Sequence, residues 1–306
     1  MKHFLTLSDL SASELRAILD DARARKAARA GRPTGAIDDD APLPGHTLAM
    51  IFEKSSTRTR FSFEQAIRQL GGSSIVATSD TMQLGRGEPI RDTARVLSRY
   101  VDAVMMRVNN HSTLTEFADF SGVPVINGLS DYNHPCQILA DLMTLEERGL
   151  TLSNLKIAWV GDGNNVAMSY VNCAAQLGFS LTVASPEGYR LRGQDVERAK
   201  ANGADIAITD DPDAAVDGAD VVVTDCFVSM GDEDYTERLT ALSPYQIDQA
   251  RLKKARSNAI VLHCLPAYRG QEISDAVLEG AQSAVWDEAE NRLHAQKAIL
   301  NWCLQS

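Results

Sequence analysis

Three short polar stretches of this chain carry the residue types that could do chemistry, and each follows an apolar run. They are Ser55–Arg60, which reads SSTRTR, His134–Gln137, which reads HPCQ, and His263–Pro266, which reads HCLP. Short apolar runs such as Leu48–Phe52 predict buried strands. Ligands of an open parallel sheet bind beyond the carboxyl ends of its strands. All three stretches are therefore predicted to lie where a substrate would bind.

The first stretch, SSTRTR, has the composition of a phosphate site. The apolar positions of 63–70 recur at helical spacing, so the stretch is expected to be a turn from a strand into a helix. The positive end of a helix attracts phosphate, and Arg58 and Arg60 add donors that can hold two oxygens at once. Taken alone, the same residues would also fit a helix capped by Ser56 or Thr57 with two solvated arginines. The other motifs decide between these two interpretations.

Four separated motifs together resemble those of the ornithine carbamoyltransferases. The motifs are Phe52–Arg60, His134–Gln137, Asp225 with Ser229–Gly231, and His263–Pro266. The resemblance extends nearly end to end, from Leu5–Leu7 to the final helix around Arg292. It implies an enzyme that moves the carbamoyl group of carbamoyl phosphate to the side-chain amine of L-ornithine, giving L-citrulline and phosphate. The reaction would serve arginine biosynthesis or run in the reverse, catabolic direction.

The alternation of strand and helix patterns predicts an α/β fold with two Rossmann-like domains, each a mainly parallel sheet with helices on both faces. Gly149 and Thr151–Ser153 mark the expected boundary, and the alternation restarts with Lys156–Val160. We therefore expect domains at 1–148 and 149–306, with the active site in the cleft between them. By the resemblance, the first domain binds carbamoyl phosphate, the second binds ornithine, and the last helix, about 289–304, packs back on the first domain.

Carbamoyl phosphate presents a phosphate and a planar carbamoyl group, so its site needs two kinds of partner. The SSTRTR stretch would hold the phosphate, while Arg107, His134 and Gln137 follow other predicted strands and could reach the carbamoyl group. Losing one donor to an oxygen that gains charge in the transition state typically costs about 3–4 kcal/mol. Without a substrate to bind, the same residues have simpler interpretations: Arg107 could be a surface charge and His134 could shape a turn. The resemblance implies these ligands of carbamoyl phosphate: Ser56, Thr57, Arg58, Thr59, Gln83, Arg107, His134, Gln137, Cys264, Leu265 and Arg292.

The second substrate raises a protonation problem, because a primary amine with an ordinary pKa near 10.4 is charged at neutral pH. Only the neutral amine attacks, which costs roughly 4–5 kcal/mol. Our hypothesis is that Asp225 stabilises the charged amine and that Cys264 lies close to the path of its proton. A buried cysteine is more often inert, and unchanged turnover in Cys264→Ala would remove it from the mechanism. The resemblance implies Asn165, Asp225, Ser229 and Met230 as ornithine ligands, and Arg58, Arg107, His134, Asp225 and Cys264 as catalytic residues.

Two polar segments are expected to be loops that serve the site. The stretch 81–87 contains Gln83 and two glycines. In the resembled family this loop reaches the site of a neighbouring subunit in a homotrimer. The segment Val228–Pro244 is too long for a tight connection, so we expect it to act as a lid. In the resembled family this segment closes over ornithine.

The composition fits a soluble two-domain enzyme without a metal or cofactor. The chain has 306 residues, of which 44% are hydrophobic, and its net charge of −11 argues against nucleic acid or an anionic membrane as a partner. Its five cysteines form no CxxC pair, and its six histidines match no zinc pattern. We therefore expect no disulfide framework, a cytoplasmic location and no signal or membrane segment. Arginines at the phosphate also remove the usual need for magnesium.

Three alternatives stay open. The stretch Gly161–Asn165 follows a strand like a dinucleotide-binding turn, but Val166 replaces the third glycine and Glu187 is a poor candidate for the acidic residue. An NAD-dependent dehydrogenase is therefore the runner-up class. A carbamoyltransferase for N-acetylornithine, putrescine or aspartate is a second alternative, and a catalytically dead paralogue that only binds is a third. The sequence leaves open the direction of the reaction, the order of substrate binding, regulation, and a trimer against a larger assembly.

Overall fold

The computed structural model describes residues 1–83, 87–228 and 234–305 of the chain. Contacts divide the chain into two compact units, of which one contains residues 1–143 and 291–306 and the other 144–290. We call these the first and the second unit. The boundary expected between residues 148 and 149 lies just behind α5 (Pro135–Glu147) and remains a prediction.

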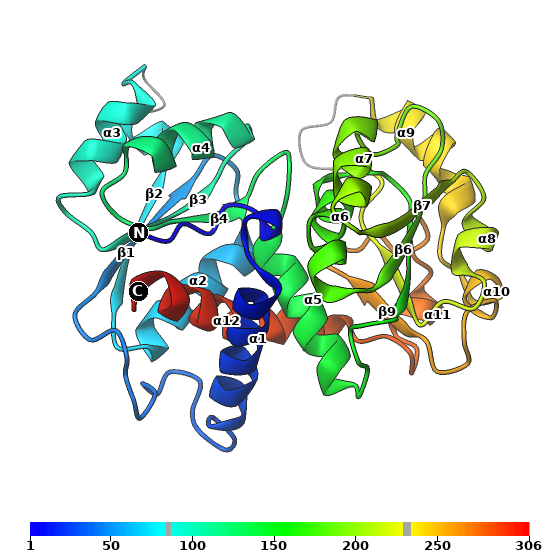
Figure 1. Ribbon diagram of the computed structural model, residues 1–306, viewed down its shortest axis with the longest axis horizontal. Coiled ribbons are helices and arrows are strands. Elements are labelled where there is room, and N and C mark those ends of the chain that lie inside the picture. The colour runs from blue at the N-terminus through cyan, green and yellow to red at the C-terminus, as the bar shows by residue number, and fades with distance from the viewer. Residues whose placement is uncertain (84–86, 229–233, 306) are drawn as a thin grey trace. The chain divides into compact units, whose positions relative to one another are not determined.

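The first unit is built on a four-stranded parallel sheet with the order β2-β1-β3-β4. Its strands are β1 (Thr47–Phe52), β2 (Ser73–Thr78), β3 (Ala103–Arg107) and β4 (Val125–Leu129). Its helices are α1 (Ala12–Ala27), α2 (Thr57–Gln69), α3 (Ile90–Leu97), α4 (His111–Phe120), most of α5 and the larger part of α12 (Val285–Leu304), with short 3₁₀ turns at η1 (Leu7–Asp9) and η2 (Ser79–Thr81). Figure 1 shows α3 and α4 together on one side of this sheet and α2 and α12 on the other.

The strands of the first sheet form because their apolar runs are buried on both faces. Ala49 and Ile51 of β1 share one core cluster with Val104 of β3 and with Phe117 of α4. The neighbouring Met50 is equally buried, so β1 has no solvent face. The strand β2, in contrast, lies at the edge and alternates between exposed and half-buried residues. The buried strands β1, β3 and β4 thus fix the ends from which the polar stretches start.

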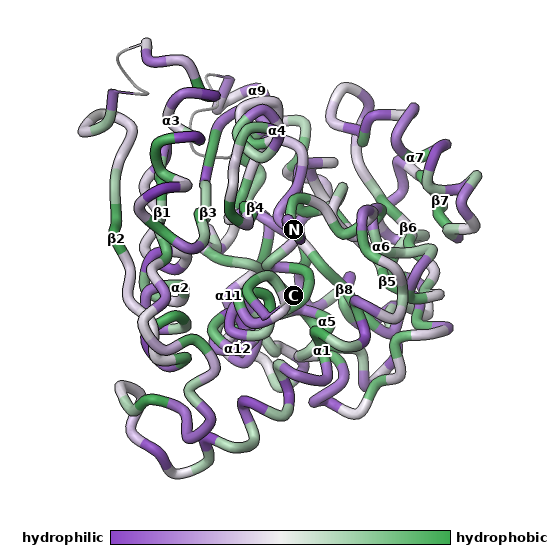
Figure 2. The backbone as a smooth tube through the Cα atoms, turned by 60° about the vertical axis from the view of Figure 1, so that its left-hand side comes forward, coloured by the Kyte–Doolittle hydropathy of each residue, from purple (hydrophilic) through white to green (hydrophobic). Residues whose placement is uncertain are grey.

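The second unit contains a five-stranded parallel sheet with the order β7-β6-β5-β8-β9. Its strands are β5 (Lys156–Val160), β6 (Ser180–Ala184), β7 (Asp205–Thr209), β8 (Val221–Thr224) and β9 (Ile260–His263). Its helices are α6 (Asn165–Leu177), α7 (Gly193–Ala201), α8 (Pro212–Val216), α9 (Tyr235–Leu242), α10 (Gln249–Leu252) and α11 (Asp275–Leu278), with a 3₁₀ turn at η4 (Ser243–Tyr245). In Figure 2 the strands of both units appear mostly as hydrophobic segments, while the helices mix hydrophobic and hydrophilic residues.

The prediction of an α/β fold with two parallel sheets flanked by helices is confirmed. Two expected elements were placed wrongly. The last helix begins at Val285 instead of about 289. The segment Val228–Pro244, expected to be a loop throughout, contains the helix α9, whose few apolar residues gave no clear period. In the part of the chain that the structure describes, no helix combines the length and apolar character needed to span a membrane.

Candidate active site

The helix α2 begins at the SSTRTR stretch, directly beyond the carboxyl end of β1. Ser56 is its N-cap residue, and its hydroxyl accepts a hydrogen bond from the backbone N–H of Thr59 at 3.3 Å. The first turn contains Arg58 and no acidic residue, although the start of a helix is already partially positive. Such a turn suits an anion. Arg60 is exposed and pairs at 3.7 Å with Glu64 of the same helix, so the half-buried Arg58 is the better placed of the two arginines.

Arg292 of α12 joins three of the predicted ligands of carbamoyl phosphate. Its guanidinium donates to the Thr59 hydroxyl at 2.8 Å and to Nε2 of His134 at 3.3 Å. It also donates to the side-chain oxygen of Gln137. Each of these four side chains is at most 4% exposed. We call the following six residues the arginine cluster: Arg58, Thr59, Arg107, His134, Gln137 and Arg292.

His134 is a neutral imidazole in this cluster. An arginine only donates, so Nε2 of His134 is the acceptor and the ring proton lies on Nδ1. Burial, together with the charges of Arg292, Arg107 and Arg58, holds the pKa of His134 well below its ordinary value. Arg58 and Arg107 therefore act electrostatically on the same ring. At neutral pH His134 can serve as a hydrogen-bonding partner and not as a charged acid.

The side-chain amide of Gln137 is oriented by Asp141, a residue that the sequence analysis missed. The Gln137 nitrogen donates to Oδ1 of Asp141 at 2.8 Å, and Asp141 is only 1% exposed. Because the nitrogen faces Asp141, the amide oxygen faces Arg292. The spacing of four residues along α5 is the signal that could have found this pair.

The remaining predicted residues of the first unit are less buried than Thr59, His134, Gln137 and Arg292. Arg107 ends β3, is half-buried, and its backbone carbonyl accepts a hydrogen bond from the N–H of Glu53 at 2.9 Å. Thr57 is the exposed first residue of α2. Gln83 is exposed, and its backbone carbonyl accepts a hydrogen bond from the N–H of Glu88 at 3.1 Å.

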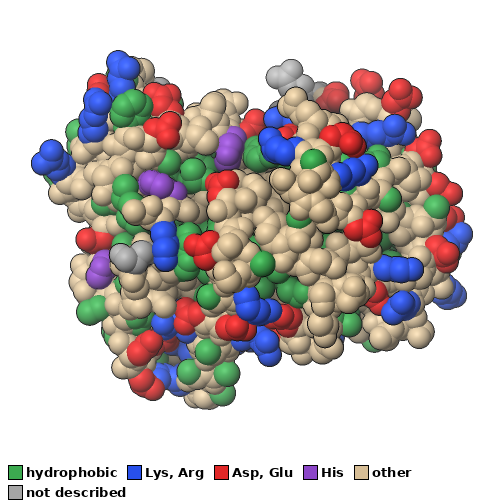
Figure 3. Space-filling view, viewed as in Figure 1, with side chains coloured by type: hydrophobic (Ala, Val, Ile, Leu, Met, Phe, Trp, Pro, Cys, Tyr) green, Lys and Arg blue, Asp and Glu red, His purple; other side chains and the backbone are tan. Residues whose placement is uncertain are grey.

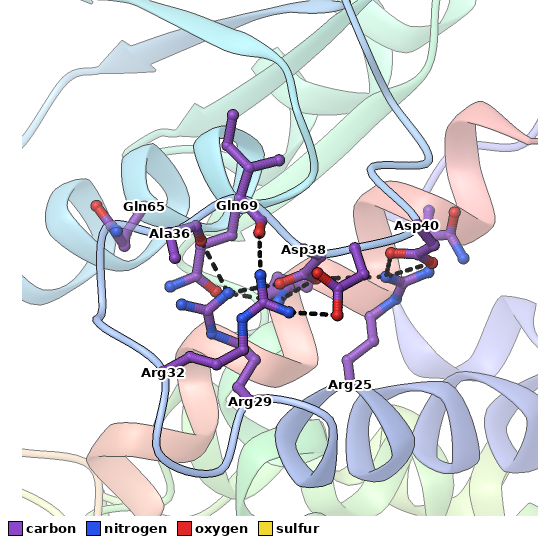
Figure 4. A network of polar contacts seen from close by, with 12 residues as sticks. Arg25, Arg29, Arg32, Ala36, Asp38, Asp40, Gln65 and Gln69 are labelled. Carbon is purple, nitrogen blue, oxygen red and sulfur yellow. Dashed lines mark hydrogen bonds and ion pairs between the residues drawn. The ribbon is translucent and has the colours of Figure 1, made fainter.

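The helix α12 is held by a buried ion network, part of which is shown in Figure 4. Lys297 is fully buried; its ammonium lies 2.5 Å from Oδ2 of Asp38 and donates to the side-chain oxygen of Gln69 at 3.0 Å. Arg29, in the turn just after α1, donates to the other Asp38 oxygen at 2.6 Å, and Arg25 of α1 lies 3.5 Å from Asp38. Burial raises the pKa of Asp38, but the hydrogen bonds from Lys297 and Arg29 outweigh this effect and hold it below the ordinary value.

This network connects α12 to both ends of α2. Thr59 in the first turn of α2 contacts Arg292, and Gln69 at its last position contacts Lys297. Lys26 of α1 donates to the side-chain oxygen of Asn291 at 2.7 Å, next to Arg292. The position from which Arg292 reaches the arginine cluster is therefore fixed by polar contacts to two other helices.

Asp225 of the second unit lies just beyond β8 and has a partner on each carboxylate oxygen. The thiol of Cys264 donates to Oδ1 at 3.1 Å, and the side-chain amide of Asn164 donates to Oδ2 at 2.8 Å. The strands β8 and β9 pair in parallel with Thr224 opposite His263, so the next residues of both strands come side by side. We call Asn164, Asp225 and Cys264 the Asp225 cluster. The predicted proximity of Asp225 and Cys264 is thus present, while Asn164 was missed although an asparagine before a helix is a typical N-cap.

Cys264 is protonated in this cluster. Burial and the carboxylate of Asp225 raise the pKa of its thiol well above the ordinary value. The following Leu265 adopts a left-handed backbone conformation, with φ of 60°, and its N–H donates to Nδ1 of His263 at 2.9 Å. Nε2 of His263 lies 3.0 Å from a carboxylate oxygen of the buried Glu272. A protonated thiol held by Asp225 argues against a covalent nucleophile.

Among the described residues, one group offers three ligand atoms to a metal within 4.8 Å of one another, namely Asp225, His263 and Cys264. Both ring nitrogens of His263 already have hydrogen-bonding partners, and a metal would require the thiolate of Cys264. These residues therefore fit the handling of a proton better than the binding of a metal ion.

The turn Gly161–Asn165 follows β5 and opens α6, which is the position of a dinucleotide-binding turn. A Cβ atom on Gly163 would lie 2.5 Å from the backbone nitrogen of Leu191, so this glycine is required by the close approach of two chain segments.

Asn165, the predicted ornithine ligand, is the half-buried first residue of α6, while the contact to Asp225 comes from Asn164. Ser229 and Met230 lie outside the described residues.

Comparisons with known proteins agree with the resemblance seen in the sequence. A family model described as "Aspartate/ornithine carbamoyltransferase, carbamoyl-P binding domain" matches residues 2–147. A second, described as "Aspartate/ornithine carbamoyltransferase, Asp/Orn binding domain", matches residues 153–303.

Similar proteins match the chain over nearly its whole length. An ornithine carbamoyltransferase of Caulobacter vibrioides is 56% identical over 302 residues, which are 99% of this chain and 97% of that protein. One of Rhizorhabdus wittichii is 55% identical and covers 99% and 98%. The solved ornithine carbamoyltransferase of Pyrococcus furiosus has a TM-score of 0.93 at 45% identity and covers 100% of this chain and 97% of that one. The chain therefore belongs to the aspartate/ornithine carbamoyltransferase family.

Proposed function

We propose that this protein transfers the carbamoyl group of carbamoyl phosphate to the side-chain amine of L-ornithine and releases L-citrulline and phosphate. The observation that carries the proposal is the buried contact of Arg292 with Thr59, His134 and Gln137. Similar proteins at 52–56% identity are named ornithine carbamoyltransferase, which supports ornithine as the acceptor. A catalyst accelerates both directions, so the same reaction serves arginine synthesis or its reverse.

The start of α2 and the arginine cluster together suit both ends of carbamoyl phosphate. The phosphate would bind at the start of α2, where Ser56, Thr57 and Arg58 combine hydroxyls, backbone N–H groups and a positive charge. Thr59, Arg107 and His134 would serve the carbamoyl oxygen, the side-chain oxygen of Gln137 would accept a hydrogen of the carbamoyl nitrogen, and Arg292 would close over the same substrate. Because these donors are held in place before the reaction, they can stabilise the charge that builds on the oxygen as the amine attacks.

The Asp225 cluster suits the attacking amine. A carboxylate in a largely buried position attracts the ammonium form of ornithine, and Cys264 lies directly beside it. The amine must lose a proton before its nitrogen bonds to the carbamoyl carbon, and the bond from that carbon to the phosphate oxygen then breaks. In this proposal Asn165, Ser229 and Met230 hold the amino-acid end of ornithine and the Leu265 carbonyl binds carbamoyl hydrogens.

The proposal requires both clusters in one reaction, because neither contains partners for both substrates. The arginine cluster is cationic and offers donors to a phosphate and a carbonyl oxygen. The Asp225 cluster offers a carboxylate to an amine. Loss of either cluster should therefore abolish turnover while leaving the substrate of the other cluster able to bind.

We further propose a homotrimer in which Gln83 acts in the site of a neighbouring copy. The outer face of α2 and the edge strand β2 expose Phe61 and Ile75, which are 69% and 55% exposed. Phe61, Gln65 and Ser74 also line a hollow of about 430 Å³ on that face, which a second copy of this chain could fill. Mixing two inactive variants, Gln83→Ala and Arg292→Ala, should restore part of the activity if Gln83 acts on a neighbour. A mixture that stays inactive would contradict this assignment.

We also propose a cytoplasmic enzyme without a metal or cofactor. All five cysteines lie among the described residues and none forms a disulfide, as a reducing compartment would require. On the face shown in Figure 3, acidic and basic side chains are interspersed, in line with the net charge of −11 and with small-molecule substrates.

The decisive experiment measures product formation from carbamoyl phosphate with L-ornithine, N-acetyl-L-ornithine, putrescine and L-aspartate side by side, with a chelator present. Citrulline from ornithine alone is the expected result. Preference for another amine would keep the carbamoyl phosphate site and overturn the acceptor. No product with any of the four amines, together with tight binding of NAD, would favour an NAD-dependent dehydrogenase instead.

A further inference from the structure

The side chain of Asn164 makes two kinds of contact at once. Its oxygen accepts hydrogen bonds from the backbone N–H groups of Val166 at 2.9 Å and Ala167 at 3.2 Å, which caps α6. Its nitrogen donates to Oδ2 of Asp225 at 2.8 Å. One amide therefore links the start of a helix to the end of the neighbouring strand β8.

The cap decides which way this amide faces. The oxygen is held by the N–H groups of α6, so only the nitrogen can point to Asp225. Serine or aspartate would cap the helix equally well. Serine has no second donor group to reach Asp225, and aspartate would place a second negative charge against it. Asparagine is the residue that meets both demands.

Asp225 is consequently held on both sides. Cys264 donates to one of its oxygens and Asn164 to the other, and the side chain is only 7% exposed. A buried carboxylate is costly without such donors. With both bonds present, the carboxylate has one fixed orientation before any substrate binds.

We propose that Asn164 is a positioning residue that orients Asp225 toward the side-chain amine of the acceptor. The proposal deepens the proposed carbamoyl transfer and rests on it. Asn164 itself does not touch the reacting atoms. It acts on the side-chain amine only through Asp225, so its loss should weaken ligands that carry a side-chain amine and spare ligands without one.

The test compares Asn164→Ser with Asn164→Ala. Serine keeps the cap of α6 and loses the donor to Asp225, while alanine loses both. Asp211→Ala is the matched control, because the Asp211 side chain caps α8 of the same unit through Asp213 and Ala214 and has no contact with the Asp225 cluster among the described residues. Thermal unfolding shows how much stability each variant has lost.

The expected result separates the two substrates. In Asn164→Ser, KM for L-ornithine should rise about tenfold to a hundredfold, since a hydrogen bond to a charged group is lost. KM for carbamoyl phosphate should stay within twofold. Binding of L-norvaline, which has the carbon chain of ornithine without its terminal amine, should also stay within twofold. Asp211→Ala should change none of these values.

A second readout does not depend on the activity. The rate of alkylation of Cys264, followed on its own peptide by mass spectrometry, should increase in Asn164→Ser because Asp225 no longer holds the thiol firmly. Unchanged alkylation together with unchanged KM values, or an equal rise of all KM values in Asn164→Ser and Asp211→Ala, would overturn the role of Asn164. A wild-type protein that makes no citrulline would overturn the proposed function instead, and alkylation would still decide whether Asn164 holds Asp225.

Discussion

The arginine cluster of the first unit and the Asp225 cluster of the second unit differ in charge and in the way they are held. The first gathers three arginines around the neutral His134. The second has one carboxylate with an amide and a protonated thiol. The difference matches the two substrates, because a phosphate and a carbonyl oxygen need donors whereas an amine needs an acceptor.

The clusters also differ in the distance along the chain over which they are assembled. Arg292 contacts Thr59 across 233 positions of sequence, and the buried pair of Lys297 and Asp38 stabilises that arrangement. Asp225 and Cys264 meet because β8 and β9 are neighbours in one sheet. A substitution that breaks a contact between helices, such as the pair of Lys297 and Asp38, should therefore affect the arginine cluster more than the Asp225 cluster.

The largest effect is expected for Arg292→Ala. Removing the residue that holds Thr59, Gln137 and His134 together should lower kcat/KM by about a hundredfold to a thousandfold, because the donors to the developing oxyanion lose their positions. Arg292→Lys should not rescue the activity, because an ammonium cannot reproduce the forked guanidinium. Steady-state kinetics and a thermal unfolding control check this. Activity within tenfold of wild type, or rescue by lysine, would remove Arg292 from the centre of the site.

A smaller effect is expected for Lys297→Met, which leaves Asp38 buried with Arg29 as its closest partner. The free energy of unfolding in urea should fall by about 3 kcal/mol, and KM for carbamoyl phosphate should rise while KM for ornithine does not. Leu300→Ala is the matched control, because Leu300 is a fully buried residue of the same helix whose loss costs a similar amount. The same rise of KM in both variants would mean that Lys297 contributes to stability alone.

The smallest effect is a change of stability with pH that involves His294. Burial, with the charges of Lys297 and Lys26, lowers the pKa of His294 to about 3. The unfolded chain, in which a histidine titrates near 6.5, then binds more protons, so stability falls as the pH drops below 6.5.

Between pH 7 and pH 5 this residue should account for about 1–2 kcal/mol of lost stability. Urea unfolding of His294→Gln should show a correspondingly flatter dependence on pH, with His3, His111 and His134, whose pKa values are also lowered, contributing to the remainder. A wild-type slope that His294→Gln leaves unaltered would show that His294 is not held in its neutral form.

The sequence predicted those parts of the site that depend on local pattern. The strands that end at Phe52, Arg107 and Thr224 follow from their apolar runs, and the start of α2 follows from the SSTRTR stretch. The resemblance added Arg292, whose contacts no periodicity could reveal. The sequence could also have predicted Asn164 as an N-cap residue, because it stands directly before a helix and capping depends on the local sequence.

Other features depend on contacts that only the folded chain makes. Lys297 resembles an ordinary surface lysine in sequence, and its burial becomes visible only when α12 lies against Asp38 and Gln69. The helix α9 was missed because its polar residues resemble a loop. Long-range polar contacts and short polar helices therefore account for most of what the sequence did not predict.

The most direct test of the division between the clusters is Asp225→Asn, studied beside the wild type with carbamoyl phosphate and L-ornithine. The account predicts that wild type forms citrulline, that Asp225→Asn forms it at least about a hundredfold more slowly, and that calorimetric binding of carbamoyl phosphate to the variant stays within twofold of wild type. Full activity of Asp225→Asn, or loss of carbamoyl phosphate binding in it, would contradict the assignment of one substrate to each cluster.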